Sequence, residues 1–236
     1  MSPEALLQEP KTADYQELCQ ELFPSEVILV LSQQSKNESV LLKDELSLVT
    51  GYSEKRLQEF STGRWCARNA LKQLGHKPVS ILKNDKGAPI WPQGFAGSIS
   101  HCKGMYGAAV ANTRRYRSLG FDVEHLQTRS QEKAIVKYIC TEKELERLCL
   151  LSGKNLIKES RAIFSIKESF YKCLAPLVQK YFGFKYAQVQ INWSREEFTL
   201  EIVKDITTEF ISGMRFNGKA KLINQHVFTG MCLPQT

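Results

Sequence analysis

The sequence lacks long hydrophobic runs, paired cysteines and histidines spaced like metal ligands. Its longest apolar runs, such as residues 27–31, fall far short of the roughly 20 residues that cross a membrane. The first ten residues lack the basic start and apolar stretch of a secretory signal. The seven cysteines contain no CxxC pair, and the four histidines lack zinc-ligand spacing. These absences predict a reduced, cytoplasmic protein with buried free thiols, no structural zinc and no membrane association.

The chain also lacks internal repeats, low-complexity tracts and glycine/serine-rich linkers, so it reads as continuously folded. With 236 residues and 42% hydrophobic residues it is long enough to bury a real core. The formal net charge of +7 favours an anionic partner. Charge alone does not choose among nucleic acid, a phosphorylated small molecule and an acidic protein.

Hydrophobic periodicity and turn residues predict an α+β fold with helices grouped against a mostly antiparallel sheet. Ser53 is expected to cap a long helix, a Thr-x-x-Glu capping box at residues 141–144 opens another, and a further helix stops before Pro176. The helices are expected near residues 53–74, 141 onward and 155–174, and the strands near 26–32, 97–101, 106–111, 119–124, 189–191, 198–202 and 227–231.

Two carboxylates stand two residues apart in the predicted strand at residues 120–124. Because side chains alternate along a strand, Asp122 and Glu124 share one face. Adjacent carboxylates repel, and a hard cation such as Mg²⁺ relieves that repulsion. Taken alone, such a pair is more often the solvated face of an edge strand.

A second acid and a lysine share one face of the predicted helix at residues 155–174. Phe164, Glu168 and Lys172 follow i, i+4, i+8 spacing. An ordinary helix pair of this kind contributes only about 0.2–0.5 kcal/mol. The apolar and aromatic flanks instead suggest a partly buried acid and base, for which a metal or a phosphate is the expected partner.

Two further stretches are suited to phosphate binding. The loop at residues 86–92 carries a lysine among glycine and prolines, and it leads to Ser100 and His101 at a strand end. Arg64 and Arg68 lie on one face of the predicted helix at residues 53–74 and can grip phosphate. Their alternative interpretations are a structural Ser-His pair and a solvated basic face.

Taken in order, these motifs resemble a known family, the 4'-phosphopantetheinyl transferases of the Sfp type, close to the enterobactin-synthetase (EntD) branch. The stretches that carry the resemblance are Gly-Arg-x-x-Ala-Arg-x-Ala-Leu at 63–71, Lys-Gly-x-Pro-x-Trp-Pro at 86–92, Gly-Ser-Ile-Ser-His-Cys at 97–102, Gly-x-Asp-x-Glu at 120–124 and Phe-Ser-x-Lys-Glu-Ser-x-Tyr-Lys at 164–172.

The resemblance implies Mg²⁺-dependent transfer of 4'-phosphopantetheine from coenzyme A to a serine of an apo acyl or peptidyl carrier protein. Adenosine 3',5'-bisphosphate is released, and Mn²⁺ is an alternative metal. By resemblance, the metal ligands are Asp122, Glu124 and Glu168, and the catalytic residues are Glu168, Lys172 and His101. The residues that contact coenzyme A are Arg64, Arg68, Lys86, Ala88, Pro89, Ser100, His101, Asp122 and Lys172.

The family fold implies two similar α/β halves with pseudo-twofold symmetry and an active site in the cleft between them. The halves would be residues 1–117, on the nucleotide side, and 118–236, on the metal side. We expect a cytoplasmic monomer that acts on a transient, acidic carrier, binds no nucleic acid and touches no membrane. The basic turn of Arg114, Arg115 and Arg117 is a hypothetical docking site for an acidic carrier helix.

Two other functions remain open on the residues alone. A metal-dependent phosphodiesterase or nuclease also needs acidic pairs, a lysine and basic character. Against it, the Glu-Lys pair lies on a helix, whereas restriction-type nucleases carry Glu-x-Lys on a strand. A non-catalytic nucleic-acid-binding module would not need Asp122, Glu124 and Glu168, and no aromatic RNA-binding signature is present.

Overall fold

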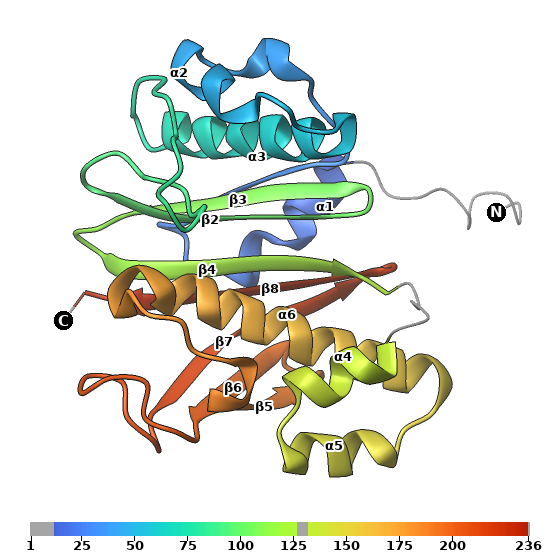
Figure 1. Cartoon of the computed structure of the whole chain (residues 1–236). Coiled ribbons are helices and arrows are strands. Elements are labelled where there is room, and N and C mark those ends of the chain that lie inside the picture. Colours follow the sequence, from blue (N-terminus) through green and yellow to red (C-terminus); the bar gives the residue numbers. More distant parts are fainter. Residues whose placement is uncertain (1–11, 127–131, 236) are drawn as a thin grey trace, which may run out of the picture.

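A computed structural model describes residues 12–126 and 132–235. The first ten residues, in which the sequence predicts no secretory signal, lie outside this range. The chain builds two antiparallel sheets, each covered by a long helix (Figure 1). A mixed helix and sheet architecture with antiparallel sheets confirms the predicted α+β class. No helix of the described residues is long and apolar enough to cross a membrane.

The first sheet has three strands in the order β1-β3-β2, namely β1 (Ile28–Ser32), β3 (Met105–Asn112) and β2 (Phe95–Cys102). Helix α3 (Glu54–Gln73) packs on it through small buried residues such as Ala67 and Ala70. Ser53 caps α3 as predicted, because its side chain accepts a hydrogen bond from the Arg56 backbone N–H.

The second sheet has five strands in the order β4-β8-β7-β6-β5. All neighbours in it are antiparallel, as the tail of the sequence predicts. The sequence pattern missed β7, in which a central Asn-Gly pair interrupts the alternation. The strands are β4 (Tyr116–His125), β5 (Ala187–Asn192), β6 (Glu197–Ile202), β7 (Arg215–Ile223) and β8 (His226–Pro234).

Helix α6 (Gly153–Val178) covers one face of this second sheet (Figure 1). The prediction that this helix stops before Pro176 is wrong. Pro176 lies inside its last turn, where a missing N–H removes a single hydrogen bond, and the helix continues to a left-handed C-cap at Gln179.

Shorter helices complete the fold. The predicted capping box is confirmed, with Thr141 and Glu144 bonded reciprocally at the start of α5. The remaining elements are α1 (Thr12–Leu18), η2 (Gln20–Leu22), η3 (Glu38–Val40), α2 (Lys43–Leu46), η4 (Ser47–Val49), α4 (Glu132–Ile139), α5 (Glu142–Cys149) and η5 (Phe184–Tyr186).

The two sheets meet where β4 lies along β2. Ser98 of β2 donates its hydroxyl to the Phe121 carbonyl of β4 at 3.2 Å. The strands of the first sheet end at Asn112 and those of the second begin at Tyr116, and the division into halves at 1–117 and 118–236 stays a prediction. That the two halves are similar and related by a pseudo-twofold axis stays a prediction.

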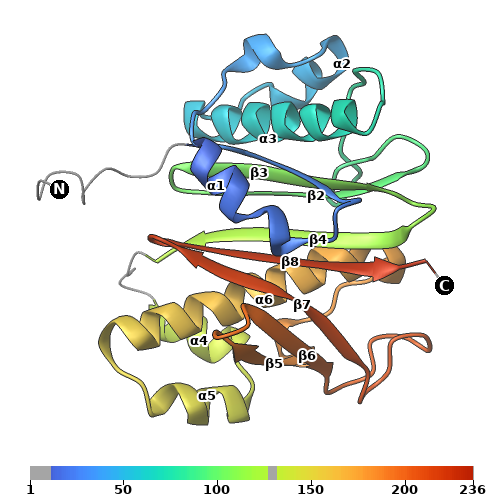
Figure 2. The same cartoon turned by 180° about the vertical axis from the view of Figure 1, so that it is seen from behind.

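The N-terminal segment joins the two sheets. α1 and the chain after it descend from the first sheet to β8 of the second (Figure 2). Tyr15, Leu22 and Phe23 share one hydrophobic cluster with Phe121 of β4 and Phe228 of β8. The core is therefore continuous across the boundary between the sheets.

All seven cysteines are free. The expectation that they are buried holds for Cys19, Cys66, Cys140 and Cys173. It is wrong for Cys149, which is exposed at the end of the short amphipathic helix α5, and Cys102 and Cys232 are half-buried.

Candidate active site

Asp122 is the centre of a buried polar cluster between the two sheets. It is only 2% exposed. Its Oδ1 accepts hydrogen bonds from Ser100 Oγ at 2.7 Å and from Lys172 Nζ at 2.6 Å. Its Oδ2 accepts one from Ser165 Oγ at 2.7 Å. One carboxylate therefore joins β2, β4 and α6, because a buried charge is retained only where it is paired and hydrogen-bonded.

A glycine brings α6 this close to β4. A Cβ atom on Gly120 would lie 1.7 Å from the Ser169 carbonyl oxygen, far inside contact distance. Only a residue without a side chain allows this approach. The Gly-x-Asp-x-Glu stretch thus holds both the carboxylates of the strand and the position of the helix against them.

Glu168 and Lys172 lie one helical turn apart on α6, as their spacing predicts. Burial raises the pKa of Glu168 above its ordinary value, although the Lys172 ammonium partly opposes this. Burial by itself would lower the pKa of Lys172, but Asp122, Glu168 and Glu124 together raise it. Lys172 is therefore firmly cationic, and Glu168 is a stronger base than an ordinary glutamate.

The three predicted metal ligands, Asp122, Glu124 and Glu168, all raise the pKa of the Lys172 ammonium group. Their carboxylate oxygens are the donors that a hard divalent cation takes, so their chemistry fits Mg²⁺. In the arrangement described, Lys172 holds Asp122, while Glu124 lies 3.7 Å from Arg161 Nη1. Among the described residues, no three acidic, histidine or cysteine side chains form a ready-made metal site.

His101 lies one residue before the end of β2, beside α3 rather than beside Asp122. Alternation along the strand turns Ser100 toward Asp122 and its neighbour His101 the other way. The His101 Nε2 lies 3.4 Å from Arg56 Nη1 and 3.8 Å from Glu59 Oε2. Burial lowers the pKa of His101, and Glu59 partly opposes this shift. Arg56 and Glu59 were not among the predicted site residues, since only the fold brings their helix to His101.

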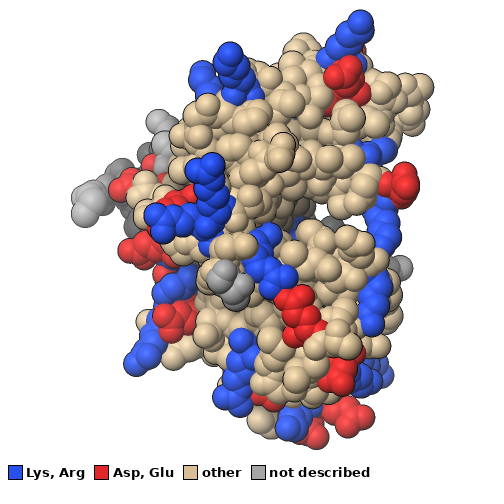
Figure 3. Space-filling model, turned by 90° about the vertical axis from the view of Figure 1, so that its left-hand side faces the viewer, with Lys and Arg blue, Asp and Glu red and all other residues tan. Residues whose placement is uncertain are grey.

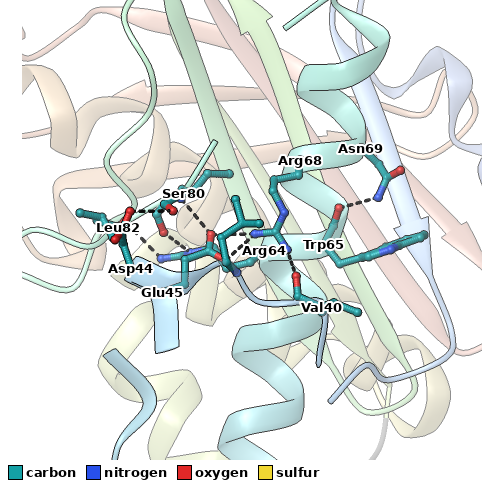
Figure 4. A network of polar contacts seen from close by, with 11 residues as sticks. Val40, Asp44, Glu45, Arg64, Trp65, Arg68, Asn69, Ser80 and Leu82 are labelled. Atoms are coloured by element: carbon teal, nitrogen blue, oxygen red, sulfur yellow. Dashed lines mark hydrogen bonds and ion pairs between the residues drawn. The ribbon is translucent and has the colours of Figure 1, made fainter. Parts of the chain in front are cut away.

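Arg64 and Arg68 form internal contacts (Figure 4). Arg64 donates to the carbonyls of Ile81 at 2.6 Å and Leu82 at 3.3 Å, and burial lowers its pKa to about 10. Arg68 pairs with the fully buried Glu45, with 2.7 Å between Arg68 Nη1 and Glu45 Oε1. The alternative of a solvated basic face is therefore wrong, because Arg64 is 5% exposed. Their predicted contact with coenzyme A stays a prediction.

The loop around Lys86 contacts α6, the helix that covers the second sheet. Lys86 Nζ donates to the Gln179 carbonyl at the C-terminal end of α6, at 2.5 Å. Asn84 Oδ1 accepts the backbone N–H groups of Lys86 and Ala88, both at 3.0 Å, which fixes the turn before Pro89. Predicted nucleotide contacts of Lys86, Ala88 and Pro89 stay predictions, and the loop is placed beside α6.

A cavity of about 170 Å³ opens next to Glu168. Its walls come from α6 and from the segment that follows, and they are mostly apolar. The sequence analysis missed these residues, although the Tyr-Phe-Gly-Phe run at 181–184 was a visible aromatic signal. The lining includes Lys167, Glu168, Phe170, Tyr171, Tyr181 and Phe182.

A buried ion pair fixes the helix at this cavity. Lys167 Nζ donates to Glu144 Oε2 at 2.6 Å and to the Ile139 carbonyl at 2.8 Å. The other Glu144 oxygen accepts the Val189 backbone N–H at 2.7 Å. α6 is thereby tied to the end of α4, the start of α5 and β5.

On the face shown in Figure 3, a hollow separates the upper and lower parts of the molecule, with Lys and Arg side chains beside it.

Comparison with known proteins gives matches over both sheets. Residues 44–111 match the 4'-phosphopantetheinyl transferase N-terminal domain, and residues 118–220 match the 4'-phosphopantetheinyl transferase superfamily.

Three relatives illustrate the similarity. 4'-Phosphopantetheinyl transferase Svp of Streptomyces mobaraensis is 34% identical over 76% of this chain and 72% of its own length. 4'-Phosphopantetheinyl transferase Npt of Nocardia iowensis is 38% identical over 61% of this chain and 64% of its own. Enterobactin synthase component D of Escherichia coli (strain K12) is 32% identical over 61% and 65%. The matches thus span a little under two thirds of Npt and of the last protein. The extent of these matches, together with the motifs around Asp122 and Glu168, shows that the chain belongs to the 4'-phosphopantetheinyl transferase family.

Proposed function

We propose that this chain transfers 4'-phosphopantetheine from coenzyme A to a serine of an apo acyl or peptidyl carrier protein. The serine oxygen forms the new bond to the β-phosphorus of coenzyme A, and the bond from that phosphorus to the bridging oxygen breaks. Adenosine 3',5'-bisphosphate leaves with the bonding electrons. The cluster of Asp122, Glu168 and Lys172 carries the proposal, because it places a base and a cation together.

Glu168 takes the proton from the serine hydroxyl, directly or through a water molecule. Its raised pKa suits this role, since a stronger base removes that proton more readily. The serine belongs to the partner, so no nucleophile of this chain is needed. The apolar cavity beside Glu168 offers room for the slender pantetheine arm.

Lys172, Ser100 and His101 bind and orient the phosphates of coenzyme A. Lys172 remains charged at neutral pH, so it stabilises the negative charge that grows on the leaving phosphate. Lys86, Ala88 and Pro89 line the nucleotide. Arg64 and Arg68 join them by giving up some of the internal contacts that Figure 4 shows.

Asp122, Glu124 and Glu168 would hold the Mg²⁺ ion, or Mn²⁺ in its place. When bound, the ion supplies positive charge at the pyrophosphate oxygens. Lys172, whose ammonium group the ion pair with Asp122 positions on α6, would add a second positive charge for the pyrophosphate.

The partner and setting follow the family. We propose that the halves at 1–117 and 118–236 enclose the site in a cleft, and that the protein acts as a cytoplasmic monomer. Seven free thiols are consistent with a reducing compartment. Apo acyl and apo peptidyl carriers are both tried as the substrate.

The test is intact-mass analysis of an apo carrier protein after incubation with this chain, coenzyme A and Mg²⁺. We expect one added phosphopantetheine, lost on adding EDTA and lost in Glu168→Gln. The matched control is Glu146→Gln, which removes an exposed carboxylate from α5 and should transfer normally. Binding of coenzyme A is measured in parallel by calorimetry. No mass gain on fatty-acid and peptidyl carriers, together with no binding of coenzyme A, would refute the proposal.

A further inference from the structure

Two buried hydroxyl groups lie beside Asp122, at the carboxylate oxygen other than the one that Lys172 contacts. Thr229 of β8 stands directly across from Asp122 of β4 in the sheet. Ser165 belongs to α6, which lies across both strands (Figure 1). Ser165 and Thr229 are both completely buried. None of the sequence motifs includes Thr229, so only the fold brings it to the candidate active site.

The two hydroxyl groups are bonded to each other as well as to Asp122. Ser165 Oγ lies 2.7 Å from Asp122 Oδ2 and 2.9 Å from Thr229 Oγ1. Thr229 Oγ1 also lies 3.0 Å from the backbone carbonyl oxygen of Ser165. These contacts join the carboxylate on β4 to α6 and to β8, and they form away from the Lys172 ammonium group.

The two hydroxyl groups have only two protons for these three contacts. A hydroxyl donates one hydrogen bond and accepts up to two. The Ser165 carbonyl oxygen can only accept, and Thr229 donates to it, which uses the Thr229 proton. The Ser165 proton then has two acceptors within reach, Asp122 Oδ2 and Thr229 Oγ1. Rotation of this one hydroxyl moves the proton from one acceptor to the other while the oxygen atoms stay in place.

The direction of the Ser165 proton decides how well Asp122 Oδ2 can attract a cation. A hydroxyl that donates to Oδ2 stabilises the buried carboxylate, but its positive end repels a second positive group at the same oxygen. A hydroxyl that donates to Thr229 leaves Oδ2 to the cation. The Ser165 proton keeps a partner in both directions, so no buried polar hydrogen is left unbonded.

We propose that Thr229 is a positioning residue that accepts the Ser165 proton when a divalent cation binds Asp122. This inference rests on the proposed function and adds a residue of β8 to it. Without the Thr229 hydroxyl, the Ser165 proton stays on Asp122 and competes with the cation. The alternative is that Thr229 only joins α6 to β8, in which case its loss lowers stability and leaves the cation affinity unchanged.

The experiment measures cation binding directly, with Mn²⁺ as the probe. The test variant is Thr229→Val, which removes the hydroxyl and keeps the branched shape. The matched control is Thr62→Val, the same change at a threonine of α3 that is equally buried and bonded to Gln58 and Lys36. Electron paramagnetic resonance of free Mn²⁺ gives the Kd in the presence of coenzyme A without a carrier, and coenzyme A without protein is the blank. The Mg²⁺ dependence of transfer and unfolding in urea are measured alongside.

For Thr229→Val we expect the Kd for Mn²⁺ and the Mg²⁺ concentration at half-maximal transfer to rise about tenfold. The kcat at saturating Mg²⁺ should stay within about twofold of the wild type, because the reacting groups are unchanged. Thr229→Ser keeps the hydroxyl and should bind Mn²⁺ normally, as should Thr62→Val. Adding Ser165→Ala to Thr229→Val removes the competing proton and should bring the Kd back to within about threefold of the wild type.

Wild-type Mn²⁺ affinity in Thr229→Val, whatever its stability, would overturn the proposal. Weak binding that persists after Ser165→Ala is added would overturn it as well, because no proton would then compete. If circular dichroism shows that Thr229→Val does not fold, Thr229→Ser and Thr229→Ala carry the same comparison, since they differ only in the hydroxyl. If the wild type bound no Mn²⁺ and transferred nothing, the proposed function would fail together with this inference, whereas normal wild-type transfer leaves the variants to decide this inference alone.

Discussion

Gly120→Ala should separate α6 from β4 and take the site apart. The added Cβ would lie 1.7 Å from the Ser169 carbonyl oxygen and 3.0 Å from the Cys173 backbone nitrogen. Real Cβ atoms essentially never approach closer than 3.0 Å, so helix and strand must part by at least about 1.3 Å. Both obstacles are backbone atoms, so no rotamer change relieves the clash.

The magnitude follows from the bonds that join these two elements. Lys172 and Ser165 reach Asp122 at 2.6 and 2.7 Å, and the added separation lengthens both contacts beyond hydrogen-bonding distance. Overpacking costs about 1–3 kcal/mol. Losing a charge-assisted bond to a buried carboxylate costs about 1.5–3 kcal/mol. Since the two effects overlap, we expect the free energy of unfolding to fall by about 3–5 kcal/mol.

The assay is urea unfolding followed by circular dichroism, with transfer to an apo carrier measured alongside. The control is Gly183→Ala, where an added Cβ meets no atom within 4 Å and φ is not positive. This control should change stability by no more than about 0.5 kcal/mol. It serves for unfolding only, because Gly183 lines the cavity beside Glu168. If Gly120→Ala unfolded at the wild-type midpoint and transferred normally, the close approach of α6 to β4 would not be what organises the site.

Three further outcomes are expected. In a histidine-labelled NMR titration, His101 should titrate below the ordinary histidine pKa, because burial disfavours the charged ring, and it should be mainly neutral at pH 7. Glu59→Gln should lower that pKa further, and a rise would contradict the assignment. Iodoacetamide at pH 8 should label Cys149 first, since burial raises the pKa of the other six thiols. Peptide mass spectra that show another cysteine reacting faster would count against the described packing. Glu45→Gln should destabilise the fold to urea by about 3–5 kcal/mol, because Arg68 is left buried without its carboxylate, and a wild-type midpoint would show the pair to be unimportant.

Short-range signals carried much of the fold. The caps at Ser53 and Thr141 predicted two helix starts correctly, because capping depends only on neighbouring residues. Alternation placed Asp122 and Glu124 on one strand, and i, i+4 spacing placed Glu168 and Lys172 on one helix face. The failures were local as well: Pro176 was tolerated in a last turn, and an Asn-Gly pair obscured β7.

The partners of the site residues could not be predicted, since they come from distant parts of the chain. The ion pair of Lys172 with Asp122 joins positions 50 residues apart, and that of Arg68 with Glu45 depends on how α2 packs on α3. Spacing placed both Arg64 and Arg68 on a helix face but could not show that the face is covered. The aromatic walls of the Glu168 cavity lie close to Glu168 in the sequence, and the run at 181–184 was a visible signal, but only the fold shows that it turns back to face α6.

The N-terminal segment has a consequence for the order in which the molecule can be built. Tyr15 accepts a hydrogen bond from Asn224, and Glu21 pairs with Lys221, so two contacts span about 200 residues of sequence. The N-terminal segment can therefore form all of these contacts only after β7 and β8, near the other end of the described chain, have been synthesised. Closing so long a loop is slow, and β4 lacks its neighbour β8 until then. On the ribosome, the hydrophobic surface of Phe23 and Phe121 should stay open to chaperones until the last strand emerges.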